Sequence, residues 1–471
     1  MAYRFVPIKI RGQPVGMLKQ EKRQKLGLWT LTALVAGNMI GSGVFLLPAS
    51  LATFGSISLL SWIATAVGAL LIALVFAKLG TIIPRIGGPY AYCREAFGDF
   101  AGFQMAYNYW IAVWVGNAAI AIALTGYLGF FLPSLAKSAM FSTWVSIALV
   151  WSVTLINCLG VRHAGIFQLL TTILKLIPLL LIALVGIFYI NPYYLTNFNL
   201  SGQSNFSAFS SAATLTLWSF IGLESASVPA GHIHNPGRNI SRATVLGVSI
   251  AAIIYICSGI AVMGIVPADQ LAHSNAPYAD VARLLFGPVG SVIIVVGAVI
   301  SCLGALNGWI LLQGQIPLAA AEDVLFPSIF KKKSANNTPI VGLVISSLLV
   351  TLLLLMTLSH SLVKQFTVII LLATLASLIP YFLTTMAALI IFLKYPGLGN
   401  GNNILGSAII AILAGAYSFW AIIGSGKETV FYGTLLLLSS VPVYVWMKWK
   451  TPSNKVHMNT GGEQPLPLSL P

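Results

Sequence analysis

Long hydrophobic stretches separated by short polar segments run along this chain from about residue 27 to residue 448. A helix that spans a bilayer needs about 20 mostly apolar residues. Twelve stretches meet that length, at about 27–53, 57–82, 101–132, 141–159, 165–190, 210–231, 244–265, 287–315, 339–358, 365–394, 405–423 and 428–448. The pattern predicts an all-α integral membrane protein whose twelve transmembrane helices form a single domain, 27–448, between tails at 1–26 and 449–471.

Composition and charge refine this prediction. The chain is 58% hydrophobic and only 7% charged, which excludes a soluble globular protein. Twenty of the 25 Lys and Arg residues fall on the side that carries both tails, four fall on the other side, and Lys175 lies within a span. This positive-inside pattern predicts cytoplasmic termini in a bacterial inner membrane. The net charge of +15 is thereby a topology signal, and no nucleic-acid partner is expected.

Two similar segments interrupt the first and the sixth predicted span. Ile40-Gly41-Ser42-Gly43 leads to Pro48-Ala49, and Ile221-Gly222 leads to Pro229-Ala230. Glycine and proline weaken a helix where the bilayer demands unbroken backbone pairing. Interrupted spans at corresponding positions of two halves indicate the binding site of a secondary transporter. Spans 1–5 (about 27–190) and 6–10 (about 210–394) then form an inverted 5+5 repeat, with spans 11 and 12 (about 405–448) added.

Two charged residues lie at membrane depth. Glu224 is the one acid of ten that falls deep in a span, and burying it there costs at least about 2.5–3.5 kcal/mol. It is either a coupling group or a protonated, hydrogen-bonded packing residue. Lys175 either extends its ammonium group to the cytoplasmic surface, or lies beside the broken-helix carbonyls, where it would replace a sodium ion or carry a proton.

Polar and aromatic residues around the breaks suggest a ligand. Free N–H groups after the first break, near Ser42 and Gly43, suit a carboxylate, and carbonyls before it, near Asn38, suit an ammonium group. Aromatic faces bind cations, and mid-span residues that could line a pocket are Trp218, Trp309, Tyr109 and Asn117. Each of these residues is also compatible with ordinary helix packing.

Other chemistry is not indicated. Tyr90, in a predicted cytoplasmic turn, could gate or relay. The histidines and cysteines lack metal-ligand spacing, and no phosphate-binding loop is present, so neither a metal nor a cofactor is expected. No nucleophile–base pair is visible, and an enzyme is not predicted.

With these residues in view, the chain resembles the amino acid–polyamine–organocation transporters from about Leu26 to Lys448. Within them it is most similar to the basic amino acid/polyamine antiporters, first the arginine/agmatine exchangers of acid resistance and then the putrescine/ornithine exchangers. The residues that carry the resemblance are Gly37 to Pro48, Leu217 to Val228, Tyr109 to Asn117, and Gly308-Trp309.

The resemblance implies roles for individual residues. The carboxylate of a substrate would bind at Ser42 and Gly43, and its amino group near Met39, Trp218 and Ile221. The guanidinium group would lie against Trp309, and further pocket residues would be Ile40, Ala112, Val113, Asn117 and Ala373. Gating or coupling roles would fall to Tyr90, Tyr109, Glu224, Tyr381 and Lys175.

Four departures from the arginine/agmatine exchangers bear on the substrate and on coupling. By the resemblance, Ile40, Val113 and Ala373 replace a Met, a Cys and a Ser, so the pocket is less polar. Lys175 is instead similar to a span-5 lysine of other amino acid carriers in the wider family. We therefore predict a homodimer in lipid that exchanges arginine for agmatine. The alternatives are a putrescine/ornithine-type antiporter, a proton-coupled symporter that uses Lys175, and, in another class, a membrane sensor.

Overall fold

The computed structural model describes residues 27–83, 88–159, 175–226, 235–334, 338–358, 360–394 and 404–450. Throughout these ranges the regular structure is helical, with no β-strand. The helices are α1 (Leu28–Met39), α2 (Ser42–Ala52), α3 (Ile57–Ile82), α4 (Pro89–Phe97), α5 (Asp99–Leu128), α6 (Ser134–Lys137), α7 (Ala139–Leu159), α9 (Leu176–Gly186), η1 (Ile187–Tyr189), η2 (Pro192–Leu195), α10 (Asn205–Leu217), η3 (Trp218–Phe220), η4 (Leu223–Ala226), α11 (Pro236–Ile265), α12 (Ala268–Leu271), α13 (Pro277–Glu322), η6 (Ser328–Lys331), α14 (Ile340–Met356), α15 (Leu362–Lys394), α16 (Ile404–Gly424), α17 (Lys427–Leu438) and α18 (Ser440–Lys450).

Most predicted spans coincide with long apolar helical segments. In the described part of the chain, ten segments are long and apolar enough to cross a membrane. Two shorter apolar helices, Leu176–Tyr189 and Ile340–Met356, lie where the fifth and ninth spans are predicted. The protein is a multi-pass membrane protein, whereas the number of twelve spans and the inverted repeat remain predictions. Both tails and the first residues of the fifth predicted span, 165–174, lie outside the described residues.

Both predicted helix breaks are present. The first separates α1 from α2 at Ile40, which is extended, and Gly41. The second follows the short 3₁₀ turn η3, where Ile221 is extended and Gly222 has a φ of 108°. Only glycine adopts such a positive φ at no steric cost. The sequence signal of glycine inside an apolar stretch therefore located both interruptions correctly.

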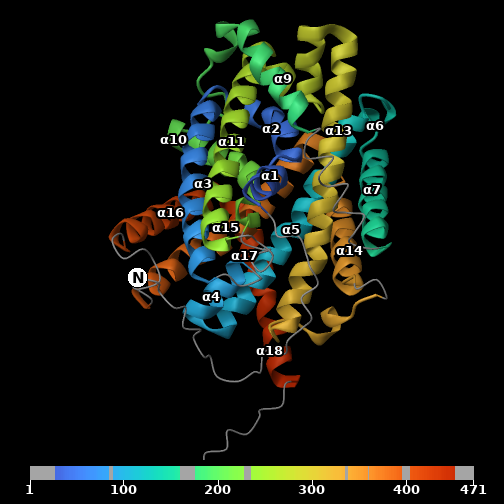
Figure 1. Cartoon of the computed structure of the whole chain (residues 1–471). Helices are drawn as coiled ribbons and strands as arrows, with labels where there is room; N and C mark the ends of the chain where they lie inside the picture. Colours follow the sequence, from blue (N-terminus) through green and yellow to red (C-terminus); the bar gives the residue numbers. More distant parts are fainter. Residues whose placement is uncertain are drawn as a thin grey trace, which may run out of the picture.

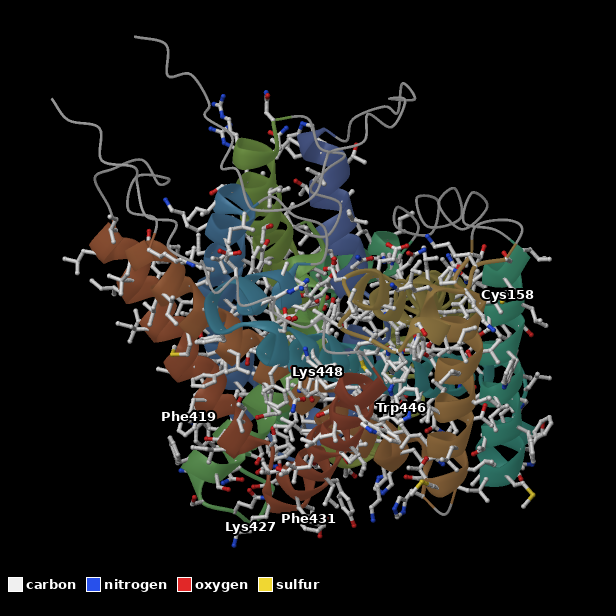
Figure 2. All side chains as sticks on the ribbon, turned by 90° about the horizontal axis from the view of Figure 1, so that it is seen from below. Cys158, Phe419, Lys427, Phe431, Trp446 and Lys448 are labelled. Carbon is white, nitrogen blue, oxygen red and sulfur yellow. The ribbon has the colours of Figure 1, made fainter. Side chains whose placement is uncertain are left out.

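The broken helices lie inside the bundle (Figure 1). In that view α1 and α2 are central, α16 lies at one edge, and α7 and α14 lie at the opposite edge. Helix α5 has almost its whole length buried and packs on α13 and α15. The side chains of Phe419 and Phe431, 54% and 60% exposed, lie at the rim on α16 and α17 (Figure 2). An apolar rim of this kind suits contact with lipid.

One local prediction is wrong, and two spans contain interruptions. Tyr90 lies in helix α4 and not in a turn, because Pro89 occupies the first helical position, where its fixed φ and missing N–H are tolerated. The eighth predicted span, 287–315, begins where α13 is interrupted: Gly287 has a non-helical φ of 70°, and the span lies in the part of α13 that follows it. The last predicted span, 428–448, coincides with the apolar segment Lys427–Trp449, within which α17 ends and α18 begins at Ser439.

Candidate functional site

The first break exposes two oppositely polarised helix ends. Helix α1 ends at Met39, so its last carbonyl groups lack partners in the helix, and α2 begins at Ser42 with free N–H groups. The hydroxyl of Ser42 is buried and has no hydrogen-bond partner among the described residues. The end of α1 therefore attracts cations, and the start of α2, with a free hydroxyl beside it, attracts an anion.

The second break lies against the first. The side-chain amide nitrogen of Asn38 donates a hydrogen bond to Ser225 Oγ at 2.8 Å. A Cβ atom added to Gly222 would lie 3.3 Å from the Cβ of Asn38. At Gly43 an added Cβ would lie 2.7 Å from Ser219 Oγ and 2.9 Å from a carbon of the Trp218 ring. Glycine at these positions lets the two interrupted segments touch.

A small cavity lies between the breaks. Its volume is about 20 Å³, which is room for about one water molecule. The indole N–H of Trp309 points to the carbonyl oxygen of Asn38 at 3.4 Å. Seven residues predicted to bind substrate line the cavity: Asn38, Met39, Ser42, Gly43, Trp218, Ile221 and Trp309. Amino acid-sized molecules would enter only if the surrounding helices separate.

Five other predicted binding residues do not line this cavity, although all are buried: Ile40, Ala112, Val113, Asn117 and Ala373. Three lining residues were not predicted to bind substrate: Gly41, which was predicted only as part of the break, Ile120 and Ala305. Ile120 follows Asn117 by three residues, so the two side chains share a face of α5. That spacing was the available signal for Ile120. Ala305, an ordinary small residue of a span, gave none.

Glu224, which follows the second break in the chain, connects that segment to two other helices. Tyr109, on α5, donates a hydrogen bond to Glu224 Oε1, and Tyr381, on α15, donates to Oε2 at 2.7 Å. All three side chains are buried. The carboxyl group is thus fixed between the second broken helix and two long unbroken helices, so a change in its hydrogen bonding would reach all of them.

Lys175 lies at the first break. Its side chain is fully buried, and its ammonium group donates a hydrogen bond to the carbonyl oxygen of Gly37, in the last turn of α1. A cation at the C-terminal end of a helix is favoured by the helix dipole. This geometry matches the predicted position beside the broken-helix carbonyls and not the surface position.

Tyr90 belongs to a separate polar cluster at the end of the bundle that carries α4. Its hydroxyl donates to Asp323 Oδ2 at 3.1 Å, and Arg94 lies 3.7 Å from the same oxygen. Burial, and then the nearby Asp323 carboxylate, raise the pKa of Tyr90 well above its usual value. The phenol therefore stays neutral and remains a donor. The cluster ties α4 to the residue that follows α13.

A second, much larger cavity of about 720 Å³ lies elsewhere, between α5, α14, α15 and α17. Its wall is mainly aliphatic and aromatic, with Trp110, Trp114 and Tyr432 among the contributors. Its polar lining includes residues at helix ends, Thr357 after α14 and Glu428 and Thr429 in the first turn of α17, and none of its lining residues belongs to the two breaks. In the described part of the chain no group of three His, Cys, Asp or Glu side chains is placed to hold a metal ion.

Two facing helix breaks around a buried cavity in a helical membrane protein define the class of secondary transporters. The sequence model of the amino acid permease family matches residues 26–446, and the chain belongs to that family. This match confirms the resemblance to the amino acid–polyamine–organocation transporters. The protein is a transporter and not an enzyme.

Individual relatives are similar over nearly their whole length. The putrescine transporter PotE of Haemophilus influenzae is 34% identical over 430 residues, which are 91% of this chain and 98% of that protein. A putative arginine/ornithine antiporter of Bacillus subtilis is 34% identical, over 92% of this chain and 99% of its own length. The cadaverine/lysine antiporter of Escherichia coli is 34% identical, over 86% and 90% respectively.

Proposed function

We propose that the protein exchanges a cationic amino acid for the amine that its decarboxylation yields, with arginine and agmatine as the pair. The observation that carries this proposal is the wall of the small cavity. It combines the N-terminal end of α2 and the free Ser42 hydroxyl with the indole ring of Trp309. The first two suit a carboxylate, and the third suits a planar guanidinium group.

The two substrates would use this wall differently. Arginine and agmatine share the guanidinium group, so both would lie against Trp309. Only arginine has a carboxylate for Ser42 and Gly43. Asn117, Val113 and Ala373 would lie beyond the present cavity and line the distal end of the site once it opens. Each exchange coupled to a cytosolic decarboxylase would remove one proton from the cytosol, which would support acid resistance.

The names of the relatives support exchange and broaden the choice of pair. They are described as transporting putrescine, as exchanging arginine and ornithine, and as exchanging cadaverine and lysine. A flux assay in proteoliposomes distinguishes the pairs. Vesicles are preloaded with one unlabelled compound (arginine, agmatine, ornithine, putrescine, lysine or cadaverine), and uptake of labelled arginine is followed.

Internal arginine or agmatine should accelerate uptake roughly tenfold over empty vesicles. Uptake that ignores the internal load would rule out exchange. If internal putrescine or cadaverine accelerates uptake most strongly, the protein would still be an exchanger, but its substrate pair would not be arginine and agmatine.

The buried contact between Lys175 and Gly37 favours a second candidate, a proton-coupled symporter. In that case an inward proton gradient would drive labelled uptake into empty vesicles, with no need for an internal substrate. The same vesicles therefore separate the two functions.

Orientation and assembly belong to the proposal as well. The positive-inside pattern supports cytoplasmic termini in a bacterial inner membrane. The exposed apolar faces of α16 and α17, which carry Phe419 and Phe431, are candidates for contact with a second copy within the lipid.

A further inference from the structure

A chain of buried amide and hydroxyl groups runs from α5 to α14 beside the small cavity. Asn117 Nδ2 donates a hydrogen bond to Gln313 Oε1 at 2.7 Å. Gln313 Nε2 donates to Ser347 Oγ at 2.9 Å and points to the carbonyl oxygen of Leu343 at 3.4 Å. All three side chains in this chain are fully buried. The proposed function gives no role to Gln313.

The chain has a fixed direction. The carbonyl oxygen of Leu343 can only accept a hydrogen bond, so the Gln313 end that faces it must be the amide NH₂. Gln313 Oε1 then faces Asn117 and can only accept. Asn117 must therefore donate its own NH₂ group. Its carbonyl oxygen, Oδ1, is left as the unused end of the amide.

That oxygen has no hydrogen-bond partner among the described residues, although it is buried. Buried acceptors are rarely left unpaired, because losing water without a replacement costs free energy. Asn117 lies one helical turn from Ile120, and Gln313 lies one turn from Trp309; both Ile120 and Trp309 line the cavity. Asn117 and Gln313 therefore lie one helical turn from residues of the cavity wall, in the region proposed for the distal end of the substrate.

We propose that Gln313 is a positioning residue that holds the Asn117 amide so that the substrate meets an acceptor and not a donor. The proposal rests on the proposed function, since it assigns the distal group as a hydrogen-bond donor such as an ammonium or guanidinium group. A donor-only end would satisfy Asn117 Oδ1, whereas an apolar end would leave it unpaired. Selectivity for cations would then depend on Gln313, although Gln313 itself would not contact the substrate.

The test compares two probes in wild-type and variant proteoliposomes. Lysine carries a distal ammonium group and norleucine lacks it, and each competes with labelled arginine for uptake. In Gln313→Met, which retains the length but loses the hydrogen bonds, the lysine-to-norleucine affinity ratio should fall about tenfold, because the Asn117 amide can rotate. In an Asn117→Ala background the same substitution should cause no further fall, since the two changes are coupled.

Asn157→Leu is the matched control. Asn157 is another fully buried amide, whose Nδ2 donates to Asn307 Oδ1 at 3.0 Å without touching Asn117. The ratio should not change in this variant. Ser347→Ala, which removes one of the two groups that hold Gln313, should lower the ratio less, and it tests the same orientation if Gln313→Met is not recovered in folded form.

An unchanged ratio in Gln313→Met, or a fall in maximal rate alone, would overturn the positioning role. If Gln313→Met cannot be recovered in folded form, an unchanged ratio in Ser347→Ala would overturn the positioning role. The role would also be overturned if Gln313→Met lowered the lysine-to-norleucine affinity ratio equally in the wild-type and Asn117→Ala backgrounds. Wild-type protein that takes up no basic amino acid would refute the proposed function itself, and the inference would fall with it. The wild-type measurement thus separates the two failures.

Discussion

The ammonium group of Lys175 donates a hydrogen bond to the carbonyl oxygen of Gly37, one turn before the first helix break. The lysine side chain is fully buried, so its nitrogen contacts the end of α1 and not water. A positive charge at this place neutralises the carbonyl end of the broken helix, as a bound sodium ion would. The contact also connects the beginning of α9 to the end of α1, whose residues Asn38 and Met39 line the small cavity.

Lys175→Ala should slow exchange by about tenfold or more. A hydrogen bond to a charged group contributes about 1.5–3 kcal/mol, and its loss frees the end of α1. Transport by the parent protein should not depend on external sodium. Exchange is measured in vesicles with and without a pH gradient, with Lys364→Ala, at an exposed lysine, as the control. Wild-type rates for Lys175→Ala under both conditions would show that the contact is not used.

Glu224→Gln should leave the protein folded but change its turnover or the pH dependence of turnover. The amide retains one acceptor oxygen, whereas the carboxyl group accepts from both Tyr109 and Tyr381, so one tyrosine must reorient. Exchange is measured from pH 4 to pH 8. Glu428→Gln, at an exposed acid of α17, serves as the control. A superimposable profile would show that Glu224 only packs the interior.

Tyr90→Phe should change the exchange rate by a similar factor at every pH between 5 and 8. Because its pKa is raised, the Tyr90 phenol is neutral throughout this range. The substitution therefore removes the hydrogen bond to Asp323 but does not remove a group that titrates between pH 5 and 8. A single hydrogen bond contributes about 1 kcal/mol, or roughly fivefold. The rates of mutant and parent are compared across the range. A ratio that changes steeply with pH would contradict this and would assign the titration to Tyr90.

The parts of the site that sequence could predict are those that are chemically unusual in a membrane. Glycine at a break and a single acid at bilayer depth each carry a cost, so Gly41, Gly222 and Glu224 stand out. Packing between distant segments leaves no such mark. Ile120 and Ala305 are residue types that are common in any span, so nothing marks them as part of the cavity wall. The pairing of Asn117 with Gln313 depends on how α5 packs against α13.

The contacts of the two tyrosines and the presence of helix α4 were likewise hard to predict from the sequence. Nothing local distinguishes Tyr109 and Tyr381 from other mid-span aromatics. Its mid-span position made Tyr109 a pocket candidate, but only the family resemblance singled out Tyr381 and gave both tyrosines a gating role. In the structure both donate to Glu224. Helix α4 is short and only mildly apolar, so neither span length nor hydropathy revealed it. Its start depends on Pro89, which the sequence reading took as part of a turn.

The contact between the two breaks can be tested at Gly222. Its φ of 108° would strain an alanine by about 1–3 kcal/mol, and the new Cβ would lie 3.3 Å from that of Asn38. Gly222→Ala should therefore lower the melting temperature in detergent and also slow exchange, because the breaks are forced apart. Gly98→Ala is the matched control: its φ is 89°, but an added Cβ meets nothing within 4 Å. Similar losses of stability in both variants, with exchange lost only in Gly222→Ala, would assign the transport defect to the contact between the breaks. Equal exchange in the two variants would show that this contact has no part in transport.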